Sequence, residues 1–143
     1  MMMPIKTKHH ILRVDEVILS LLVCKQGLRY TPMPYDPVLD TREGKLLTFD
    51  LNKPTQDPVE LTLKNFNRTG FNPHGISVYR DPSSGAVSLF VVNHRPDAQA
   101  IEIFDFEREK HSLLHRRSVI DELIWHPNNI QAVGRNQFLG CSF

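Results

Sequence analysis

Two histidines lie where β-strands are predicted to begin and end. His74 stands between Pro73 and Gly75, in a tight bend at the start of a predicted strand, and His94 ends the returning strand twenty residues later. A hairpin would bring both imidazoles to one end of a sheet. One imidazole could then take a proton from water while the second fixes its tautomer. The spacing also fits two histidines that cap strands in hydrogen-bonded turns, so both interpretations stay open.

A second polar group introduces a later strand in the order His126, Pro127, Asn128, Asn129 and Ile130. Amide oxygens are hard ligands that suit calcium, but amides bind it weakly without carboxylates. The structural alternative is an asparagine-rich turn. The sequence lacks the HExxH, EF-hand, glycine-rich phosphate-loop, CxxC and GxSxG motifs, which argues against the commonest zinc, nucleotide, redox and serine-hydrolase sites.

The composition indicates one globular domain without a strong electrostatic field. The chain has 143 residues, with 17 Lys and Arg against 16 Asp and Glu, for a formal charge of +1. Such a balance argues against nucleic acid as a partner. The longest apolar run, residues 17–24, is much shorter than the roughly 20 residues of a membrane-spanning helix, and we predict a buried strand there.

The hydrophobic pattern predicts an all-β fold that must position these polar groups. Alternation at period two predicts a half-buried strand over residues 59–64 and another over 45–51. Residues 87–92 and 101–106 are apolar on both faces, as in strands sandwiched between packed layers. Turn-forming residues between 76–79 and 87–92 predict a hairpin.

The predicted strands also repeat along the chain. A Phe-Asp pair at Phe49 recurs at Phe104, a spacing of 55 residues, and Ile76 recurs as Ile130, a spacing of 54 residues. A period of this size built from short strands favours β-propeller blades. The chain then holds about 2.6 repeats, whereas closed propellers need about four to eight blades. We therefore predict a partial propeller of two to three blade equivalents, which could self-associate through its open blade edges.

Several motifs, in unbroken order from Gly27 to Gly140, resemble the paraoxonase family of calcium-dependent arylesterases and lactonases: GLRY, GKLLTFDLN, FNPHGIS, LFVVNH, SLLHRRSVI and NNIQAVGRNQFLG. The resemblance implies a six-bladed propeller with two calcium ions in its central tunnel. We expect residues 27–143 to form part of such a propeller, after a divergent N-terminal segment over residues 1–26.

The resemblance also implies roles for individual residues. His74 and His94 match the family's histidine pair, proposed to activate the hydrolytic water. Asn128 matches a ligand of the catalytic calcium, and the backbone carbonyl of Ile76 matches a ligand of the structural calcium. Asn129 stands where the family usually has an aspartate ligand, which removes one negative charge from the structural site.

The implied function is hydrolysis of aryl esters, lactones or organophosphate esters. Calcium would polarise the carbonyl and a histidine-activated water would attack it. The family's Glu-Asp pair aligns near Leu12 and Arg13, so this chain carries few of the calcium ligands. The alternative is a catalytically inactive propeller fragment, acting as an interaction module or a splice product.

Three further expectations come from the same resemblance. A secreted protein is implied, although a signal peptide is not evident in the sequence. A lipid or lipoprotein surface is a further expected partner. The triplet that begins at Asn67 is a glycosylation sequon, which matters only for a secreted chain.

Overall fold

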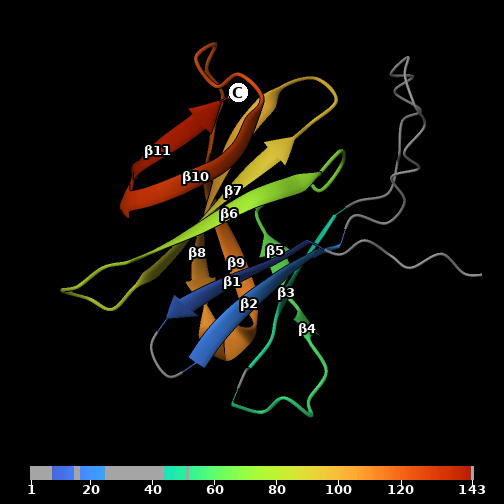
Figure 1. Ribbon diagram of the computed structural model, residues 1–143, viewed down its shortest axis with the longest axis vertical. Helices are drawn as coiled ribbons and strands as arrows, with labels where there is room; N and C mark the ends of the chain where they lie inside the picture. Colours follow the sequence, from blue (N-terminus) through green and yellow to red (C-terminus); the bar gives the residue numbers. More distant parts are fainter. Residues whose placement is uncertain (1–7, 15–16, 25–43, 51, 143) are drawn as a thin grey trace, which may run out of the picture.

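The structure is a computed structural model that describes residues 8–14, 17–24, 44–50 and 52–142. Within these ranges the chain is built from β-strands, with one 3₁₀ turn as its only helix, so the all-β prediction is confirmed (Figure 1). No helix in the described part is long and apolar enough to cross a membrane. The elements are β1 (Lys8–Val14), β2 (Val17–Cys24), β3 (Lys45–Thr48), β4 (Val59–Glu60), β5 (Thr62–Lys64), β6 (Pro73–Arg80), β7 (Val87–His94), β8 (Gln99–Glu107), η1 (Arg108–Lys110), β9 (Ser112–Val119), β10 (Pro127–Gly134) and β11 (Gln137–Ser142).

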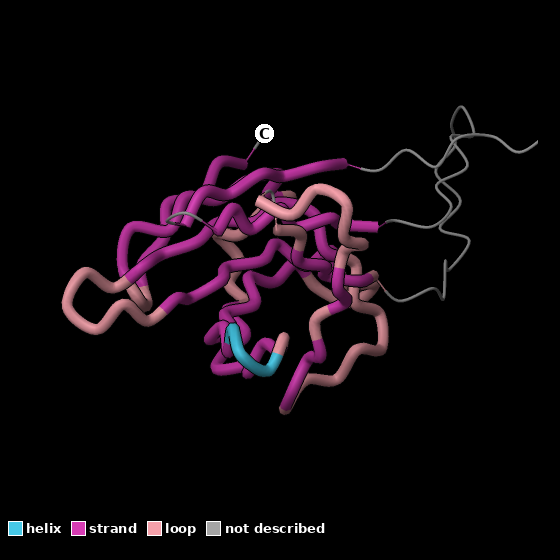
Figure 2. The backbone as a smooth tube through the Cα atoms, turned by 90° about the horizontal axis from the view of Figure 1, so that it is seen from below, coloured by secondary structure: helices cyan, strands magenta, loops and turns pink. Residues whose placement is uncertain are grey.

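The strands form three sheets, and none of them closes on itself within the described ranges. The first sheet has the order β1-β2-β3-β4, the second β5-β9-β8-β7-β6, and the third contains β10 and β11. Neighbouring strands are antiparallel, except that β5 pairs with β9 in parallel. Figure 2 shows the strands from a second side, with the short helix η1 in cyan among them.

The predicted hairpin is confirmed in β6 and β7, where Val78 pairs with Leu89. Asp81 organises the turn, because its Oδ1 accepts hydrogen bonds from the backbone N–H groups of Ser83 at 2.8 Å and Ser84 at 2.9 Å. Gly85 then adopts a φ of +70°, which glycine reaches without strain. The turn lies at the opposite end of the hairpin from His94.

The five-stranded sheet separates two hydrophobic clusters. Because successive side chains of a strand point to opposite faces, β7 and β8 supply both clusters, and the prediction of strands that are apolar on both faces is confirmed. The first cluster contains Leu46, Leu61, Phe71, Ile76, Leu89, Val91, Phe104 and Leu113. The second contains Phe90, Val92, Ile101, Ile103, Ile130 and Ala132.

The prediction of a single strand over residues 59–64 is wrong. The chain breaks at Leu61, so that β4 belongs to the first sheet and β5 to the second. Leu61 is only 1% exposed, and its N–H donates to the carbonyl of Leu46 at 2.9 Å. The alternating pattern identified the apolar side chains, but burial of Leu61 in the first cluster turns the chain from one sheet to the next.

The sheets meet along β6, which lies between β1 and β10. The N–H of Ala132 in β10 donates to Oγ of Ser77 in β6 at 2.9 Å. The two backbones approach so closely that a Cβ on Gly75 would lie 2.5 Å from the carbonyl oxygen of Asn128. Figure 1 shows β6 crossing the middle of the molecule beside these strands.

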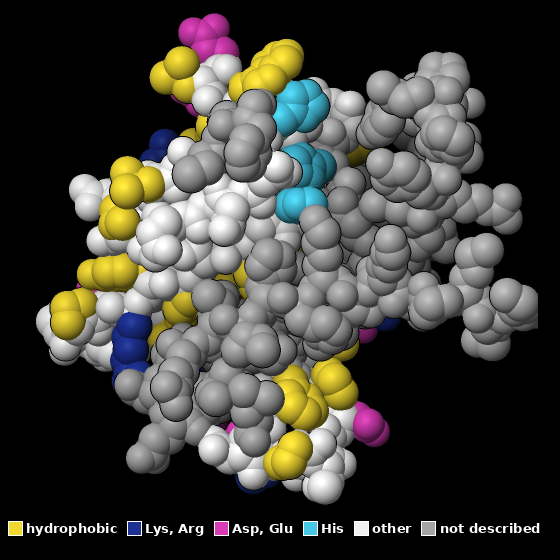
Figure 3. Space-filling model, in the orientation of Figure 1, with side chains coloured by type: hydrophobic (Ala, Val, Ile, Leu, Met, Phe, Trp, Pro, Cys, Tyr) yellow, Lys and Arg dark blue, Asp and Glu magenta, His cyan; other side chains and the backbone are white. Residues whose placement is uncertain are grey.

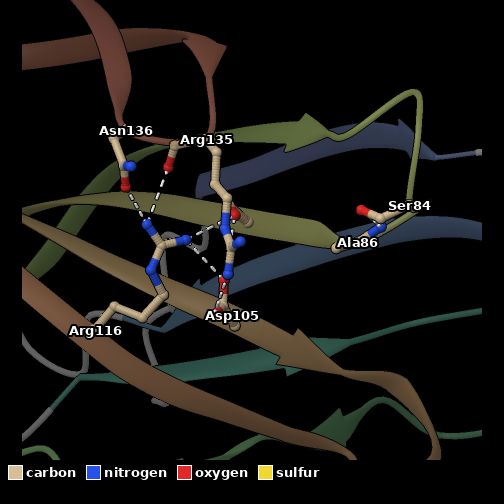
Figure 4. Close-up of polar contacts among 7 residues, drawn as sticks. Ser84, Ala86, Asp105, Arg116, Arg135 and Asn136 are labelled. Atoms are coloured by element: carbon tan, nitrogen blue, oxygen red, sulfur yellow. Dashed lines mark hydrogen bonds and ion pairs between the residues drawn. The ribbon is translucent and has the colours of Figure 1, made fainter.

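An arginine ties the β10–β11 hairpin to the second sheet (Figure 4). Arg116 of β9 donates to Oδ1 of Asp105 in β8 at 2.8 Å and to the carbonyl of Arg135 at 3.2 Å. It also contacts the side-chain oxygen of Asn136 in the hairpin turn. One guanidinium therefore bridges three segments, as its forked donors allow.

The sequence repeat matches the order of strands within the sheets. Phe104 lies in β8, the third strand of the run β6-β7-β8-β9, and Phe49 follows β3, the third strand of β1-β2-β3-β4. Ile76 and Ile130 lie in β6 and β10, which pack side by side. The number of blades in the expected propeller stays a prediction.

Candidate functional site

The β6–β7 hairpin brings His74 and His94 together. His74 is the second residue of β6, His94 is the last residue of β7, and both side chains are partly buried. Their ring centroids lie 5.0 Å apart, with the ring planes at 72°. Two imidazoles at this separation can share a water molecule or a proton. Histidine side chains also gather on the face seen in Figure 3.

Gln99 orients one of these rings. It is paired with His94 across β7 and β8, and its Oε1 contacts Nδ1 of His94. An amide oxygen only accepts hydrogen bonds, so Nδ1 of His94 is the donor in this contact. Gln99 is not among the site residues predicted from the sequence. The turn-forming residues Arg95, Pro96 and Asp97 gave the one usable signal, because they predict a return strand opposite His94.

Two hydrogen bonds to the backbone of Asn72 join the segments that carry the two histidines. The N–H of Asn72 donates to the side-chain oxygen of Asn93 at 2.9 Å, and the N–H of His94 donates to the carbonyl of Asn72 at 3.0 Å. Asn93 is 1% exposed. Asn72 is therefore held from both sides by consecutive residues of β7.

A buried carboxylate lies behind this link. Glu102 of β8 is fully buried, and its Oε1 accepts a hydrogen bond from Nδ2 of Asn93 at 2.9 Å. Its Oε2 lies 2.9 Å from Nε2 of His115 and accepts a hydrogen bond from Ser118. Glu102 is likewise not among the site residues predicted from the sequence. An acidic residue inside a run that is otherwise apolar on both faces was the available signal, since a buried carboxylate requires hydrogen-bonding partners.

The residues matched to calcium ligands lie on two strands and differ in burial. Ile76 is buried in β6, whereas the side chains of Asn128 and Asn129 are exposed on β10. The close approach of Gly75 to Asn128 places these two segments side by side. Oδ1 of Asn129 accepts the N–H of Ile130 at 3.0 Å.

This donor set does not fit calcium by itself. Ile76, Asn128 and Asn129 offer neutral oxygens, while calcium takes about six to eight oxygens that usually include carboxylates. In the described part of the chain, no group of three or more His, Cys, Asp or Glu side chains could hold a metal ion. Asp15 and Glu16, which lie near the position of the family's acidic pair, fall outside the described residues.

A model of the arylesterase family matches residues 11–142, which is most of the sequence. The chain belongs to the arylesterase family. The resemblance that the motifs predicted is thereby confirmed. The matched range begins inside the segment 1–26, and the boundary expected at residue 27 lies outside the described residues.

Curated relatives of this arylesterase chain come from several mammals. Serum paraoxonase/arylesterase 1 of Homo sapiens is 43% identical over 127 residues, which cover 86% of this chain and 34% of that protein. Serum paraoxonase/arylesterase 2 of Bos taurus is 44% identical over 98 residues, covering 68% and 27%. Serum paraoxonase/lactonase 3 of Oryctolagus cuniculus is 36% identical over 127 residues, covering 87% and 35%. The chain spans about a third of the length of these relatives.

Proposed function

We propose that this chain carries the histidine pair of an ester hydrolase that acts on aryl esters and lactones, and on organophosphate esters as a further substrate class. The observation that carries the proposal is the approach of His74 and His94, whose rings lie 5.0 Å apart at one end of a rigid hairpin. The names of the mammalian relatives, which combine paraoxonase with arylesterase or lactonase, support this substrate class.

The proposed chemistry is attack of water on the substrate carbonyl. One imidazole removes a proton from water as the water oxygen bonds to the carbonyl carbon, and the C–O bond to the alcohol or phenol breaks in the following step. The proton held by the imidazole then passes to the leaving oxygen. His94 suits the role of orienting the ring of His74, because its own ring is held by Gln99 through Nδ1.

Calcium is the proposed cofactor of the whole family protein, where it would polarise the carbonyl as a Lewis acid. Because the neutral donors of Ile76, Asn128 and Asn129 do not fit the ion by themselves, we assign no step to calcium in this chain.

The remaining proposals concern the surroundings of the site. We propose that the three sheets are parts of a six-bladed propeller, which is supported by their contacts along β6. Secretion and a lipid or lipoprotein surface as partner rest on the family. Asn67 is exposed, which suits glycosylation in a secreted chain, and the exposed residues Leu123, Trp125 and Leu139 suit self-association.

The test is hydrolysis of phenyl acetate and of a small lactone by the purified chain. We expect a rate above that of buffer, and we expect His74→Gln to reduce it by about 10² or more, because general base catalysis contributes on the order of 10²–10⁴. His111→Asn is the matched control. His111 is exposed and follows η1, at the far end of β8 from Gln99.

The outcomes separate the enzyme from the inactive fragment. A rate that falls with His74→Gln and persists with His111→Asn supports the proposal. A rate equal to that of buffer in a folded chain, with no change on substitution, would contradict catalysis by this polypeptide and leave the interaction module.

A further inference from the structure

The pairing of β6 with β7 is irregular at His74. Pro73 pairs with Asn93, and the next regular pair is Ile76 with Val91, so the register shifts between them. His74 and Gly75 lie within this irregularity. Because the ladder is locally disrupted at such a point, contacts outside the regular pairing help to aim the residue there. The relative position of the two imidazoles therefore needs a second source of order.

The side chain of Asn93 supplies that order. It is almost fully buried, and its Oδ1 accepts the N–H of Asn72 at 2.9 Å. Asn72 lies two residues before His74, and Asn93 lies immediately before His94. The carbonyl of Asn72 also accepts the N–H of His94 at 3.0 Å. One peptide segment thus connects the backbones that carry both rings.

Glu102 decides which way the amide of Asn93 points. Its Oε1 accepts from Nδ2 of Asn93 at 2.9 Å, which turns the amide nitrogen toward Glu102 and the amide oxygen toward Asn72. Its Oε2 faces His115 at 2.9 Å and accepts from Ser118. These partners come from β7 and β9, the two strands that flank Glu102 in β8. A fully buried carboxylate with partners on both oxygens has little freedom to rotate.

We propose that Asn93 is a positioning residue of the histidine pair, and that the buried carboxylate of Glu102 sets the orientation of its amide. Asn93 acts through the backbone of Asn72 and touches neither substrate nor reacting atoms. The inference rests on the proposed function only for the catalytic role of the pair. The geometric role of Asn93 is tested without any activity.

The experiment measures the nuclear Overhauser effect between the ring protons of His74 and His94 in the isotopically labelled chain. We expect a cross-peak in the parent chain and its loss in Asn93→Ala. Ser77→Ala is the matched control, because Ser77 is also buried and its side chain also accepts one backbone N–H, from Ala132. If Ser77→Ala loses the cross-peak equally, the effect is general loosening and the proposal is overturned.

Two substitutions of Glu102 test the orientation of the amide. Glu102→Gln keeps an oxygen for Nδ2 of Asn93, so we expect the cross-peak to survive. Glu102→Leu removes that acceptor, so we expect its loss. Survival of the cross-peak in a folded Glu102→Leu or Asn93→Ala chain contradicts the proposal.

A measurement without substitution decides the question if Asn93→Ala does not fold. Hydrogen exchange of the Asn72 amide is followed in the parent chain as temperature rises, together with the histidine cross-peak. The proposal requires both to be lost over the same temperature range, and persistence of the cross-peak after the Asn72 amide exchanges freely overturns it.

If the chain also hydrolyses phenyl acetate, Asn93→Ala should lower kcat at least tenfold with KM within twofold. An inactive chain that passes the Overhauser test refutes the proposed function and leaves the positioning role intact.

Discussion

At the scale of single residues, the site depends on neighbours that perform no chemistry themselves. Gln99 accepts from Nδ1 of His94, and Asn93 holds the segment that carries His74. Partners of this kind fix the tautomer and the direction of a catalytic ring, and changing them commonly costs about 10- to 100-fold in activity or affinity. The chemistry of a histidine pair is thus set by amides one hydrogen bond away.

Replacing Gln99 with leucine should release His94 without removing it. We expect the ¹⁵N spectrum of His94 to change from one protonated at Nδ1 to a mixture of tautomers, because leucine offers no acceptor. Any ester hydrolysis should fall about 10-fold or more. Gln56→Leu, at an exposed position, is the control. An unchanged His94 spectrum in Gln99→Leu would show that another group fixes the tautomer.

Adding one carboxylate should improve binding of calcium beside β6. In Asn129→Asp the new carboxylate oxygen can still accept the N–H of Ile130, and it adds a negative charge to a neutral donor set. We expect calorimetry to show a calcium dissociation constant at least about tenfold lower than in the parent chain. Asn67→Asp is matched, since Oδ1 of Asn67 also accepts a nearby backbone N–H, that of Thr69. Equal calcium binding by both variants would exclude a site at Asn129.

At the scale of elements, β5 is the strand whose place the local pattern predicts least. It is three residues long and pairs in parallel with β9, which begins about fifty residues later in the chain. Nζ of Lys64, at the end of β5, lies 2.6 Å from Oε2 of Glu107. Glu107 also contacts Lys110 and Ser112. These contacts, with that of Lys110 foremost, lower the pKa of Glu107 from 4.5 to about 2. Polar contacts therefore reinforce a short edge strand.

The stability that Glu107 gives to the edge of the sheet at β5 should depend on pH. A carboxylate with a lowered folded-state pKa stabilises the fold above its unfolded pKa, and that contribution is lost as pH falls. We expect the difference in Tm between the parent chain and Glu107→Gln to be full above about pH 4.5 and to vanish near pH 2. Thermal unfolding followed by circular dichroism measures it. A constant difference across this range would mean that the charge of Glu107 contributes nothing.

The sequence predicts elements better than their partners. The strands of the β6–β7 hairpin follow from their apolar runs and the turn at Asp81, because adjacent strands in sequence pair through short turns. The break at Leu61 does not follow, since the same apolar residue serves a continuous strand or a crossing between sheets. The parallel pairing of β5 is a long-range contact with no local signal.

The candidate site likewise contains residues that local sequence signals predict and residues that they do not. His74 and His94 could be placed at one end of a hairpin, because proline, glycine and the turn fix that geometry locally. Glu102 and Gln99 could not be assigned to them, because the register of β7 against β8 decides which side chains meet. The neutral character of Asn128 and Asn129 was visible in the sequence, and the structure adds that both are exposed.

At the scale of the whole molecule, polar and backbone contacts join the β10–β11 hairpin to the five-stranded sheet, in addition to the second hydrophobic cluster. Gly75 leaves room for Asn128, Ser77 accepts from Ala132, and Arg116 links β9 to the β10–β11 turn. These contacts join sheets that share no strand ladder. Changes at the contacts should therefore loosen one sheet from another while each sheet keeps its own pairing.

A methyl group at Gly75 should separate β6 from β10. The Cβ would lie 2.5 Å from the carbonyl oxygen of Asn128, which is backbone and cannot swing away. We expect Gly75→Ala to reduce the free energy of unfolding in urea by about 1–3 kcal/mol. Gly140→Ala is the control, because nothing lies within 4 Å of the added Cβ, and its effect should stay within about 0.5 kcal/mol. Equal effects of the two substitutions would argue against close contact at Gly75.

The turn from Asp81 to Ala86 offers a practical handle on the protein. It is exposed, ordered by its own hydrogen bonds, and separated from His94 by the full length of β7. Exposed turns of small polar residues are where added peptide is tolerated best. A short affinity tag or a cysteine for dye attachment placed after Ser84 would let the molecule be immobilised or tracked by fluorescence with its histidine end facing outward.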